Sequence, residues 1–584
     1  MSHRLLAPFA ALALSACAPA LVDSGPAATT APPQIGQHDS AVAGSQGIVS
    51  AADPRAADAG AQILRAGGNA TDAAIATMLA LTVVEPQSSG IGGGGFLVWG
   101  DAGGNVKTYD GRETAPAAAT PEWFFRDGRP MGIREAVPGG RSVGVPGSIR
   151  MVALAHREHG KLAWKRLFAP AIGLARDGFA VTPRLYEVLD KFRAIGALDP
   201  DGRAMFYQAD GSPLAQGTIV RRPALAAFLG ELAAKGPDAF YIGANAAAVA
   251  NEVQASPRNP APMQTSDLAA YDAKERQPLC GMYRAYRICG MGPPSSGATT
   301  VFATLKQLER FDLTALGKDS PVAWHLIAES ERLAYADRGR YLGDSDFVSV
   351  PAAGLMDANY LASRSALIDP ARTLGVVSPG VPPGAQALTW ADPASQPENG
   401  TSHFVAVDKG GSAVSYTSTI ESIFGSGLVV NGYYLNNELT DFNLAPNDAT
   451  GRPTANRVEP GKRPRSSMSP TLVYGPDGAL RLAIGAAGGS TIPAQVLKAI
   501  IGVIDWKLSA QDALGLPVIY APEGDIVFVE KGSALEAMIP ALAALGHKSV
   551  IARAPSFKAN AVERIGNRWL GAADPRSEGA AVAQ

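Results

Sequence analysis

The stretch that decides the fold is Asn399-Gly400-Thr401-Ser402-His403-Phe404-Val405-Ala406-Val407-Asp408. A flexible glycine precedes a threonine, and the residues that follow alternate as expected for a β-strand over 402–407. A threonine hydroxyl in this position can attack the preceding carbonyl, and the α-amine then released, with a reference pKa of about 7.7–8, can act as a base. This arrangement suits a self-cleaving N-terminal nucleophile, although a Gly-Thr pair before a strand is, taken alone, more typical of a turn.

Helical and strand patterns alternate from about residue 47 onward, with no clear linker. Two helices are predicted in 51–81, separated at Gly67-Gly68, with Asn69 or Thr71 capping the second. Residues 145–275 are mostly helical in pattern, 322–335 has amphipathic helical spacing, and 375–400 is polar and irregular. Strands are expected at 96–99, 106–109, 412–419, 428–435, 471–474 and 481–484.

The composition is that of a large globular chain. Its 584 residues are 46% hydrophobic, and 64 glycines and 44 prolines make it rich in turns. At about 150 residues per domain the length would allow about four domains. The 51 basic and 53 acidic residues give a net charge of −2, which removes any bulk electrostatic reason to expect a nucleic acid as partner.

The N-terminus predicts export and a lipid anchor. Residues 1–16 carry one arginine and a short apolar run, as a secretory signal peptide does, and Leu14-Ser-Ala-Cys17 resembles a bacterial lipobox. Cys17 is then the lipidated residue, and 17–46, rich in alanine, proline and small polar residues, is a flexible tether. We expect the protein on the periplasmic side of a bacterial membrane, most simply the outer membrane; an ordinary signal peptide is the alternative.

Export makes a disulfide between Cys280 and Cys289 plausible. A two-residue turn at Arg284-Ala285 pairs these cysteines across a hairpin, in the closer kind of antiparallel pair. Two reduced, packed thiols are the alternative.

Two apparent motifs carry no chemistry. Gly90–Gly95 satisfies G-x-G-x-x-G but leads from a helix into a strand, so close backbone packing explains it better than phosphate binding. His156 and His159 lack a metal-binding frame and are expected on a solvated helical face. We predict neither a metal nor a cofactor.

The wider pattern resembles the γ-glutamyltransferase (γ-glutamyltranspeptidase) family of N-terminal nucleophile hydrolases. Matching blocks run in family order from about 47 to 577 and include Asp110-Gly-Arg-Glu-Thr-Ala-Pro116, Leu435-Asn-Asn-Glu-Leu-Thr-Asp-Phe442, Lys462-Arg-Pro-Arg-Ser-Ser-Met-Ser-Pro470 and Gly485-Ala-Ala-Gly-Gly-Ser490. The resemblance implies an α+β fold, a four-layer αββα sandwich with additional helices. It also implies a large subunit, 47–400, and a small catalytic subunit, 401–584, forming one interwoven domain.

The resemblance assigns roles to single residues. Thr401 is the nucleophile of both self-cleavage and catalysis, the Thr419 hydroxyl orients the Thr401 amine, and Gly488 and Gly489 line the oxyanion site. Substrate-binding residues fall into two groups by charge. Arg112, Ser466 and Ser467 match the group that receives the α-carboxylate, and Glu438 and Asp441 match the group that receives the α-ammonium.

Two departures bear on the substrate. Glu421 stands where well-studied members carry asparagine, which bears on how the α-ammonium is recognised, and the segment between Asp441 and Ser466 is shorter than the lid of some members. The expected activity is cleavage of γ-glutamyl amides such as glutathione, with transfer of the acyl group to water, an amino acid or a peptide. The alternatives are a related amidase, such as a cephalosporin acylase or polyglutamate-processing enzyme, and a non-catalytic peptide-binding surface lipoprotein.

Overall fold

The computed structural model describes residues 42–44, 46–385, 400–448, 450–522, 524–555 and 557–584. The predicted signal peptide, Cys17 and the tether up to residue 41 lie outside the described residues, as do 386–399. One compact unit spans 39–584, so the length-based expectation of about four domains is wrong. Within the described ranges, no helix combines the length and the apolar character needed to cross a membrane.

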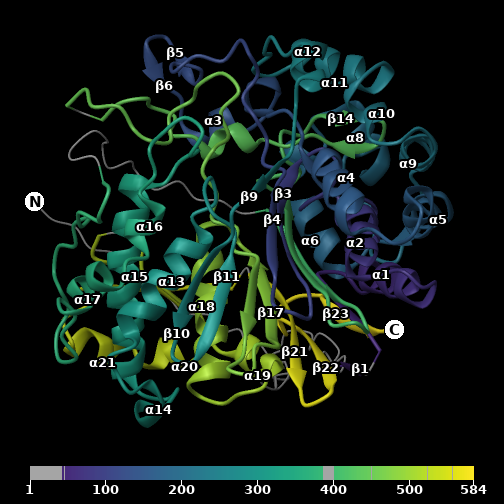
Figure 1. The fold of residues 1–584 in the computed structure, drawn as a ribbon. Helices are drawn as coiled ribbons and strands as arrows, with labels where there is room; N and C mark the ends of the chain where they lie inside the picture. Colours follow the sequence, from purple (N-terminus) through teal and green to yellow (C-terminus); the bar gives the residue numbers. More distant parts are fainter. Residues whose placement is uncertain (1–41, 45, 386–399, 449, 523, 556) are drawn as a thin grey trace, which may run out of the picture. The chain divides into compact units, whose positions relative to one another are not determined.

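Two seven-stranded antiparallel sheets form the centre of this unit (Figure 1). The first sheet has the order β23 (Ala580–Ala583), β2 (Ile48–Ala51), β12 (Ser402–Val407), β13 (Ala413–Thr419), β3 (Gly94–Gly100), β4 (Val106–Asp110) and β9 (Lys274–Arg276). The second has the order β1 (Val42–Gly44), β22 (Arg568–Ala573), β21 (Lys558–Ile565), β17 (Leu480–Ala487), β16 (Thr471–Tyr474), β11 (Tyr286–Gly290) and β10 (Leu279–Tyr283). Each sheet therefore combines strands from before and after Gly400.

Side-chain alternation along β12 shows how the layers stack. Val405 and Val407 share a hydrophobic core with Ile484 of the second sheet, so they lie between the sheets. Phe404 and Ala406 belong instead to the core formed with α1 (Pro54–Arg65) and α2 (Ala70–Val84). The outer face of the second sheet is covered by α13 (Gly297–Leu308), α15 (Pro321–Tyr341), α18 (Ile492–Ile504) and α19 (Ala510–Gly515). The predicted αββα order is confirmed (Figure 1).

The additional helices lie within 145–275, the region that the sequence predicts to be mostly helical. They are α4 (Ser148–His159), α5 (Ala169–Asp177), α6 (Pro183–Lys191), α7 (Arg193–Gly196), α8 (Pro200–Phe206), α9 (Pro223–Lys235), α10 (Asp238–Tyr241), α11 (Ala244–Ala255) and α12 (Thr265–Ala269). The cap of α2 is Asn69, whose side chain accepts from the Asp72 N–H, while Asp72 accepts from the Asn69 N–H.

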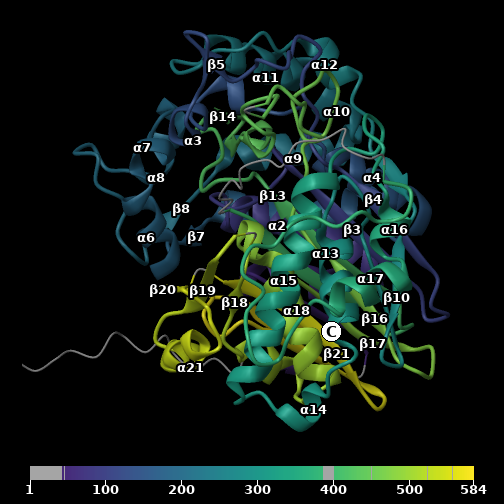
Figure 2. The ribbon, with the colours of Figure 1, turned by 90° about the vertical axis from the view of Figure 1, so that its left-hand side faces the viewer.

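Helix α15 differs from the amphipathic helix that its spacing predicts. Nearly every residue of α15 is buried, including the charged Glu329, Glu331 and Arg332. Figure 2 shows the reason: α15 lies in front of α13 and α18 and beside the small sheet of β18 (Ile519–Tyr520), β19 (Ile526–Glu530) and β20 (Ser549–Arg553). Its polar face is therefore covered by other parts of the chain instead of by water.

Two further expectations are wrong. The single strand predicted at 428–435 is a hairpin of β14 (Val429–Val430) and β15 (Tyr433–Tyr434), because Asn431 and Gly432 take positive φ values of 47° and 82°, as a tight turn requires. Residues 42–44, predicted within the tether, form β1 and pair with β22.

Candidate active site

Thr401 lies directly before β12 and is 5% exposed. Its Oγ1 lies against the Gly400 carbonyl and 3.2 Å from Thr419 Oγ1. The Thr419 hydroxyl donates to the Gly400 oxygen at 2.9 Å and accepts from the Glu421 N–H at 2.8 Å. The geometry thus places a hydroxyl at the carbonyl of the preceding peptide bond and a second hydroxyl where it polarises that carbonyl.

Glycines let the backbone close around these threonines. A Cβ on Gly400 would lie 2.2 Å from the Glu421 oxygen, and one on Gly93 would lie 1.9 Å from the Thr419 oxygen. Only glycine fits at either position. The explanation of Gly90–Gly95 as a close-packing run that leads into β3 is confirmed.

Gly488 and Gly489 directly follow β17, with φ values of 126° and 59° that favour glycine. His403 shares a face of β12 with Thr401, and a Cβ on Gly485 would lie 2.3 Å from the His403 ring. Ser415, the partner of Val405, donates to the Ile484 oxygen at 3.0 Å. His403 thus lies against Gly485 and Val405 lies near Ile484, so the end of β17, which Gly488 and Gly489 follow, is on the Thr401 side of β12.

Arg112 occupies the centre of the predicted substrate-binding group and is 1% exposed. Its guanidinium bonds to Glu438 and Asp441, and it donates to the Pro464 oxygen at 3.1 Å and the Arg465 oxygen at 2.8 Å. The structure therefore brings the predicted carboxylate-binding and ammonium-binding groups into direct contact with each other. A zwitterionic substrate would have to separate them and bind one part of each pair.

Burial and charge oppose one another in this group. Burial raises the pKa of both Glu438 and Asp441, although Arg112 acts in the other direction. Burial also works against the charge of Arg112, but Glu438 and Asp441 outweigh it and raise its pKa. Arg112 therefore stays charged, while burial favours the neutral form of both carboxyl groups and the charge of Arg112 opposes it.

Ser466 and Ser467 lie next to the two carbonyls that hold Arg112. Ser466 accepts from the Met468 N–H at 3.2 Å, and Ser467 accepts from Arg338 at 2.5 Å. Ser296 donates to the Ser466 oxygen at 2.6 Å. These contacts fix the segment that positions Arg112.

Glu421 is held beside the nucleophile in an unusual backbone conformation, with φ 73°. Its carboxylate accepts from Ser422 and from Asn437, and Asn437 accepts from the Ser422 N–H at 2.8 Å. Asn437 is a site residue that the sequence reasoning missed, although it is part of the Asn-Asn-Glu run that precedes Glu438.

Glu113 is the second missed residue. It is fully buried, and its carboxyl group lies in hydrogen-bonding contact with that of Glu438. Burial raises the pKa of Glu113 to about 8, with Arg112 opposing the shift. The sequence feature that could have identified Glu113 as a site residue is its position directly after Arg112.

Cys280 and Cys289 form a disulfide on the hairpin of β10 and β11. The predicted register is confirmed, with Cys280 opposite Cys289 and Tyr283 opposite Tyr286. The expectation of a solvated face at His156 and His159 is wrong: His159 stacks on Trp99 with ring centroids 3.8 Å apart, and the His156 ring lies 2.8 Å from the Leu162 oxygen.

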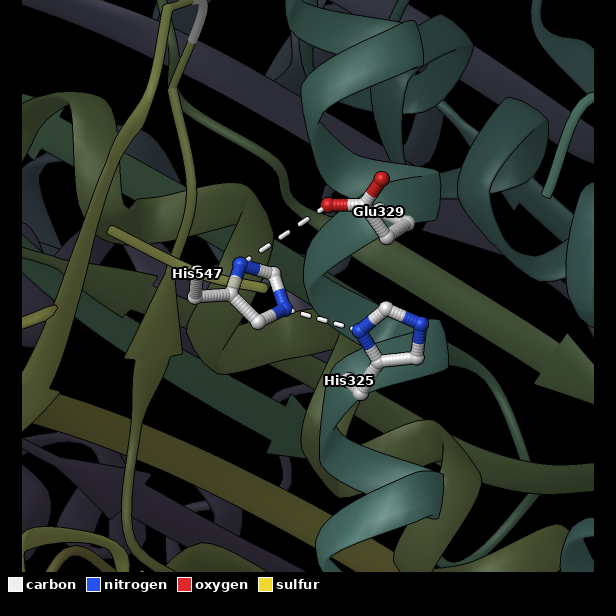
Figure 3. Close-up of side chains that lie close together, drawn as sticks. All are labelled: His325, Glu329 and His547. Carbon is white, nitrogen blue, oxygen red and sulfur yellow. Dashed lines mark hydrogen bonds and ion pairs between the residues drawn. The ribbon is translucent and has the colours of Figure 1, made fainter. Parts of the chain in front are cut away.

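A second polar cluster, here called the imidazole cluster, consists of His325 and Glu329 on α15 and His547 before β20 (Figure 3). Their ligand-type atoms all lie within 4.8 Å of one another. His325 Nε2 is 2.9 Å from the Asp369 oxygen, His325 Nδ1 is 2.8 Å from His547 Nε2, and His547 Nδ1 is 3.8 Å from Glu329.

The His547 ring stands between the other two side chains, with one nitrogen towards each (Figure 3). A metal ion bound to either nitrogen would therefore face only one of the two partners. Glu329 also accepts from Arg332 at 2.7 Å, from Thr373 at 2.9 Å and from the Leu374 N–H at 2.6 Å. Hydrogen bonds and one longer contact between His547 and Glu329 thus join distant segments in series, rather than placing ligands around one point.

Comparison with known proteins agrees with this geometry. The model of the gamma-glutamyltranspeptidase family matches residues 56–584. The chain is 36% identical over 549 residues to a glutathione hydrolase proenzyme of Escherichia coli (strain K12), covering 92% of this chain and 91% of the relative. It is also 36% identical to the acylase ACY 1 proenzyme of Pseudomonas sp. (strain SE83), covering 92% and 94%. A crystal structure of cephalosporin acylase from Bacillus halodurans superposes with a TM-score of 0.83 at 26% identity, covering 95% and 98%. The chain is a member of the γ-glutamyltranspeptidase family and has the fold of an N-terminal nucleophile hydrolase.

Proposed function

We propose that this protein is a self-processing γ-glutamyl hydrolase and transferase that acts on glutathione-like donors. The observation that carries the proposal is the contact of Thr401 Oγ1 with the Gly400 carbonyl, together with the Thr419 hydroxyl 3.2 Å away. Relatives named glutathione hydrolase proenzyme, which match nearly the whole chain, support the same activity.

The processing step is an N-to-O acyl shift. Thr401 Oγ1 attacks the Gly400 carbonyl carbon, the C–N bond breaks, and the hydroxyl proton passes to the departing nitrogen. Water then hydrolyses the ester, giving a large chain that ends at Gly400 and a small chain that begins with a free Thr401 amine.

Turnover uses the same hydroxyl. The neutral α-amine takes its proton, Oγ1 attacks the γ-carbonyl of the donor, and the N–H groups near Gly488 and Gly489 stabilise the oxyanion. The leaving amine takes a proton, and water, an amino acid or a peptide accepts the acyl group. Arg112, Ser466 and Ser467 receive the donor's α-carboxylate, and Glu421, Glu438 and Asp441 receive its α-ammonium.

The N-terminus adds a location to the proposal. Cys17 carries a lipid, the tether follows it, and the enzyme is held on the periplasmic side of a bacterial membrane. Incorporation of a labelled fatty acid into the wild-type protein and its absence from Cys17→Ser test this part separately.

Denaturing electrophoresis and a donor assay test the activity. Wild type should give two chains and release glutamate from glutathione, whereas Thr401→Ala should give one chain and lose activity. Thr401→Ser, which keeps a hydroxyl at the same position, is the matched control and should still process. A wild-type protein that stays one chain and cleaves no amide contradicts the proposal and favours a peptide-binding lipoprotein.

A second candidate is an amidase with a different acyl group. Relatives named acylase ACY 1 proenzyme, and Glu421 in place of the usual asparagine, favour it. Glutathione, a cephalosporin side-chain amide and poly-γ-glutamate compared as donors distinguish the candidates, because the preferred one should have the highest kcat/KM.

A further inference from the structure

Four buried side chains lie directly behind the nucleophile and are here called the brace: Glu85, Ser88, Ser402 and Lys558. Glu85 ends α2, Ser402 opens β12 next to Thr401, and Lys558 opens β21. Lys558 Nζ lies 2.8 Å from Glu85 Oε2, 3.2 Å from Ser402 Oγ and 3.3 Å from Ser88 Oγ. Ser402 also donates to Glu85 Oε2 at 2.6 Å. The brace thus joins the residue after Thr401 to a buried ion pair.

The segment 85–88, at the end of α2, is also hydrogen-bonded to the residues that follow Thr419. The Ser88 oxygen accepts from the Ile420 N–H at 3.2 Å, and the Gln87 oxygen accepts from the Phe424 N–H at 3.0 Å. One short segment at the end of α2 is therefore hydrogen-bonded to the neighbour of Thr401 and to the neighbour of Thr419. The separation of the two threonine hydroxyls depends on this common support.

Stability alone is a weak explanation of the ion pair. Moving a carboxylate and an ammonium out of water costs several kcal/mol for each ion, and well-packed apolar residues often do as well or better. Here the Glu85 carboxylate contacts Lys558 and also accepts from Ser402, the residue directly after Thr401. That placement points to control of geometry.

We propose that Glu85 and Lys558 are positioning residues that act through Ser402 to hold Thr401 Oγ1 in register with Thr419 and the Gly400 carbonyl. The catalytic part of this inference rests on the proposed function, and the self-cleavage part does not. Once the Gly400–Thr401 bond is broken, Thr401 becomes a chain end, and chain ends lose order unless they are tied down. Apart from the Thr401 hydroxyl itself, Ser402 is then the first residue from the new chain end whose side chain is hydrogen-bonded to the rest of the protein.

The direct test is Ser402→Ala, with Ser50→Ala as the matched control. Ser50 is also buried on the first sheet; its hydroxyl donates to the Ala572 oxygen at 2.7 Å and accepts from Asn560 at 3.0 Å, so its partners are not members of the brace. We expect Ser402→Ala to slow self-cleavage and lower kcat by about tenfold or more, because a displacement of about 1 Å can cost about 10²-fold. KM should change less than about twofold, and Ser50→Ala should change neither rate.

The ion pair is tested with Lys558→Met and with the double variant Glu85→Gln/Lys558→Met. The single change leaves a buried carboxylate unpaired and is expected to impair folding; the double change removes both charges and should fold. The folded double variant should still cleave itself at least about tenfold more slowly than wild type.

Wild-type rates of self-cleavage in Ser402→Ala or in the double variant overturn the proposal. A loss carried by KM, or an equal loss in Ser50→Ala, overturns it as well. A wild-type protein that cleaves itself but releases no glutamate from γ-glutamyl donors refutes the proposed function, while the self-cleavage rates still decide the role of the brace.

Discussion

The nucleophile region and the imidazole cluster are both buried and polar, and both join segments from before and after Gly400. In the imidazole cluster, Glu329 accepts from three donors and the two rings are hydrogen-bonded in series. Around the nucleophile, the carboxyl groups of Glu113 and Glu438 are buried beside each other with Arg112 as the cation that acts on both, and Glu421 has a positive φ. The difference indicates that the imidazole cluster is held together by satisfied hydrogen bonds, whereas the nucleophile region contains crowded carboxyl groups that a cationic group of a ligand can stabilise.

Replacing Arg112 in the nucleophile region and Arg332 beside the imidazole cluster should have the largest and most different effects on activity and stability. Arg112→Lys keeps the charge but loses the fork that contacts two carboxylates and two carbonyls. We expect donor kcat/KM to fall by about 10²–10³-fold, in line with about 1.5–3 kcal/mol for each hydrogen bond to a charged group that is lost.

Arg332→Lys is the matched change beside the imidazole cluster, where Arg332 donates to Glu329. It should lower the melting temperature while leaving kcat/KM of the folded enzyme within about threefold, as expected for a site remote from the reacting atoms. Comparable losses of activity in both variants would remove the functional distinction between the regions.

His547→Gln should lower stability by about 1–3 kcal/mol at pH 7.5, because it leaves buried partners unsatisfied, and should leave self-cleavage unchanged. Burial, assisted by the charge of Arg332 and by His325, lowers the pKa of His547 to about 4, against about 6.5 in an unfolded chain. The unfolded state therefore binds more protons, so the contribution of His547 is complete above about pH 6.5 and is lost as the pH falls towards 4.

Thermal unfolding of wild type and His547→Gln between pH 4 and 7.5 measures this contribution. The advantage of wild type should decrease as the pH falls, and a constant difference would contradict a neutral, buried His547. The lowered pKa of His403 is common to both proteins and cancels from the comparison.

Glu113→Gln should have the smallest effect at pH 5. Burial raises the pKa of Glu113 to about 8, above about 4.3 for an unfolded chain, so its contribution to stability is present at low pH and is lost as the pH rises through 8. At pH 5 the free energy of unfolding of the variant should lie within about 1 kcal/mol of the wild-type value. Towards pH 8 the variant should become more stable relative to wild type. Calorimetry at pH 5 and pH 8 measures both values; a larger loss at pH 8 than at pH 5 would show that the carboxyl is paired.

Local patterns were sufficient for the elements whose determinants are local. The cap at Asn69, the hairpin with Cys280 opposite Cys289 and the strand after Thr401 depend on neighbouring residues, and each has the predicted form. The roles given to Thr401, Arg112 and the other site residues came from the resemblance to the family, because no spacing rule joins residues so far apart in the chain.

The expectations that failed depended on distant parts of the chain. The spacing of α15 describes which residues share a face, but not that other segments cover its polar face. His325 and His547 are 222 positions apart, so no local pattern brings them together. Glu113 and Asn437 become site residues only when the loops that contain them meet.

The two strands β12 and β13 lie between β2 and β3, which come from the part of the chain before Gly400. Thr401 therefore reaches Thr419 and the Gly400 carbonyl only after these strands have been inserted and Gly93 has closed against Thr419. In a chain that cuts itself at this bond, misassembled copies keep the peptide intact and have no free amine. The topology would then act as a quality check, in which only correctly assembled molecules leave the latent state.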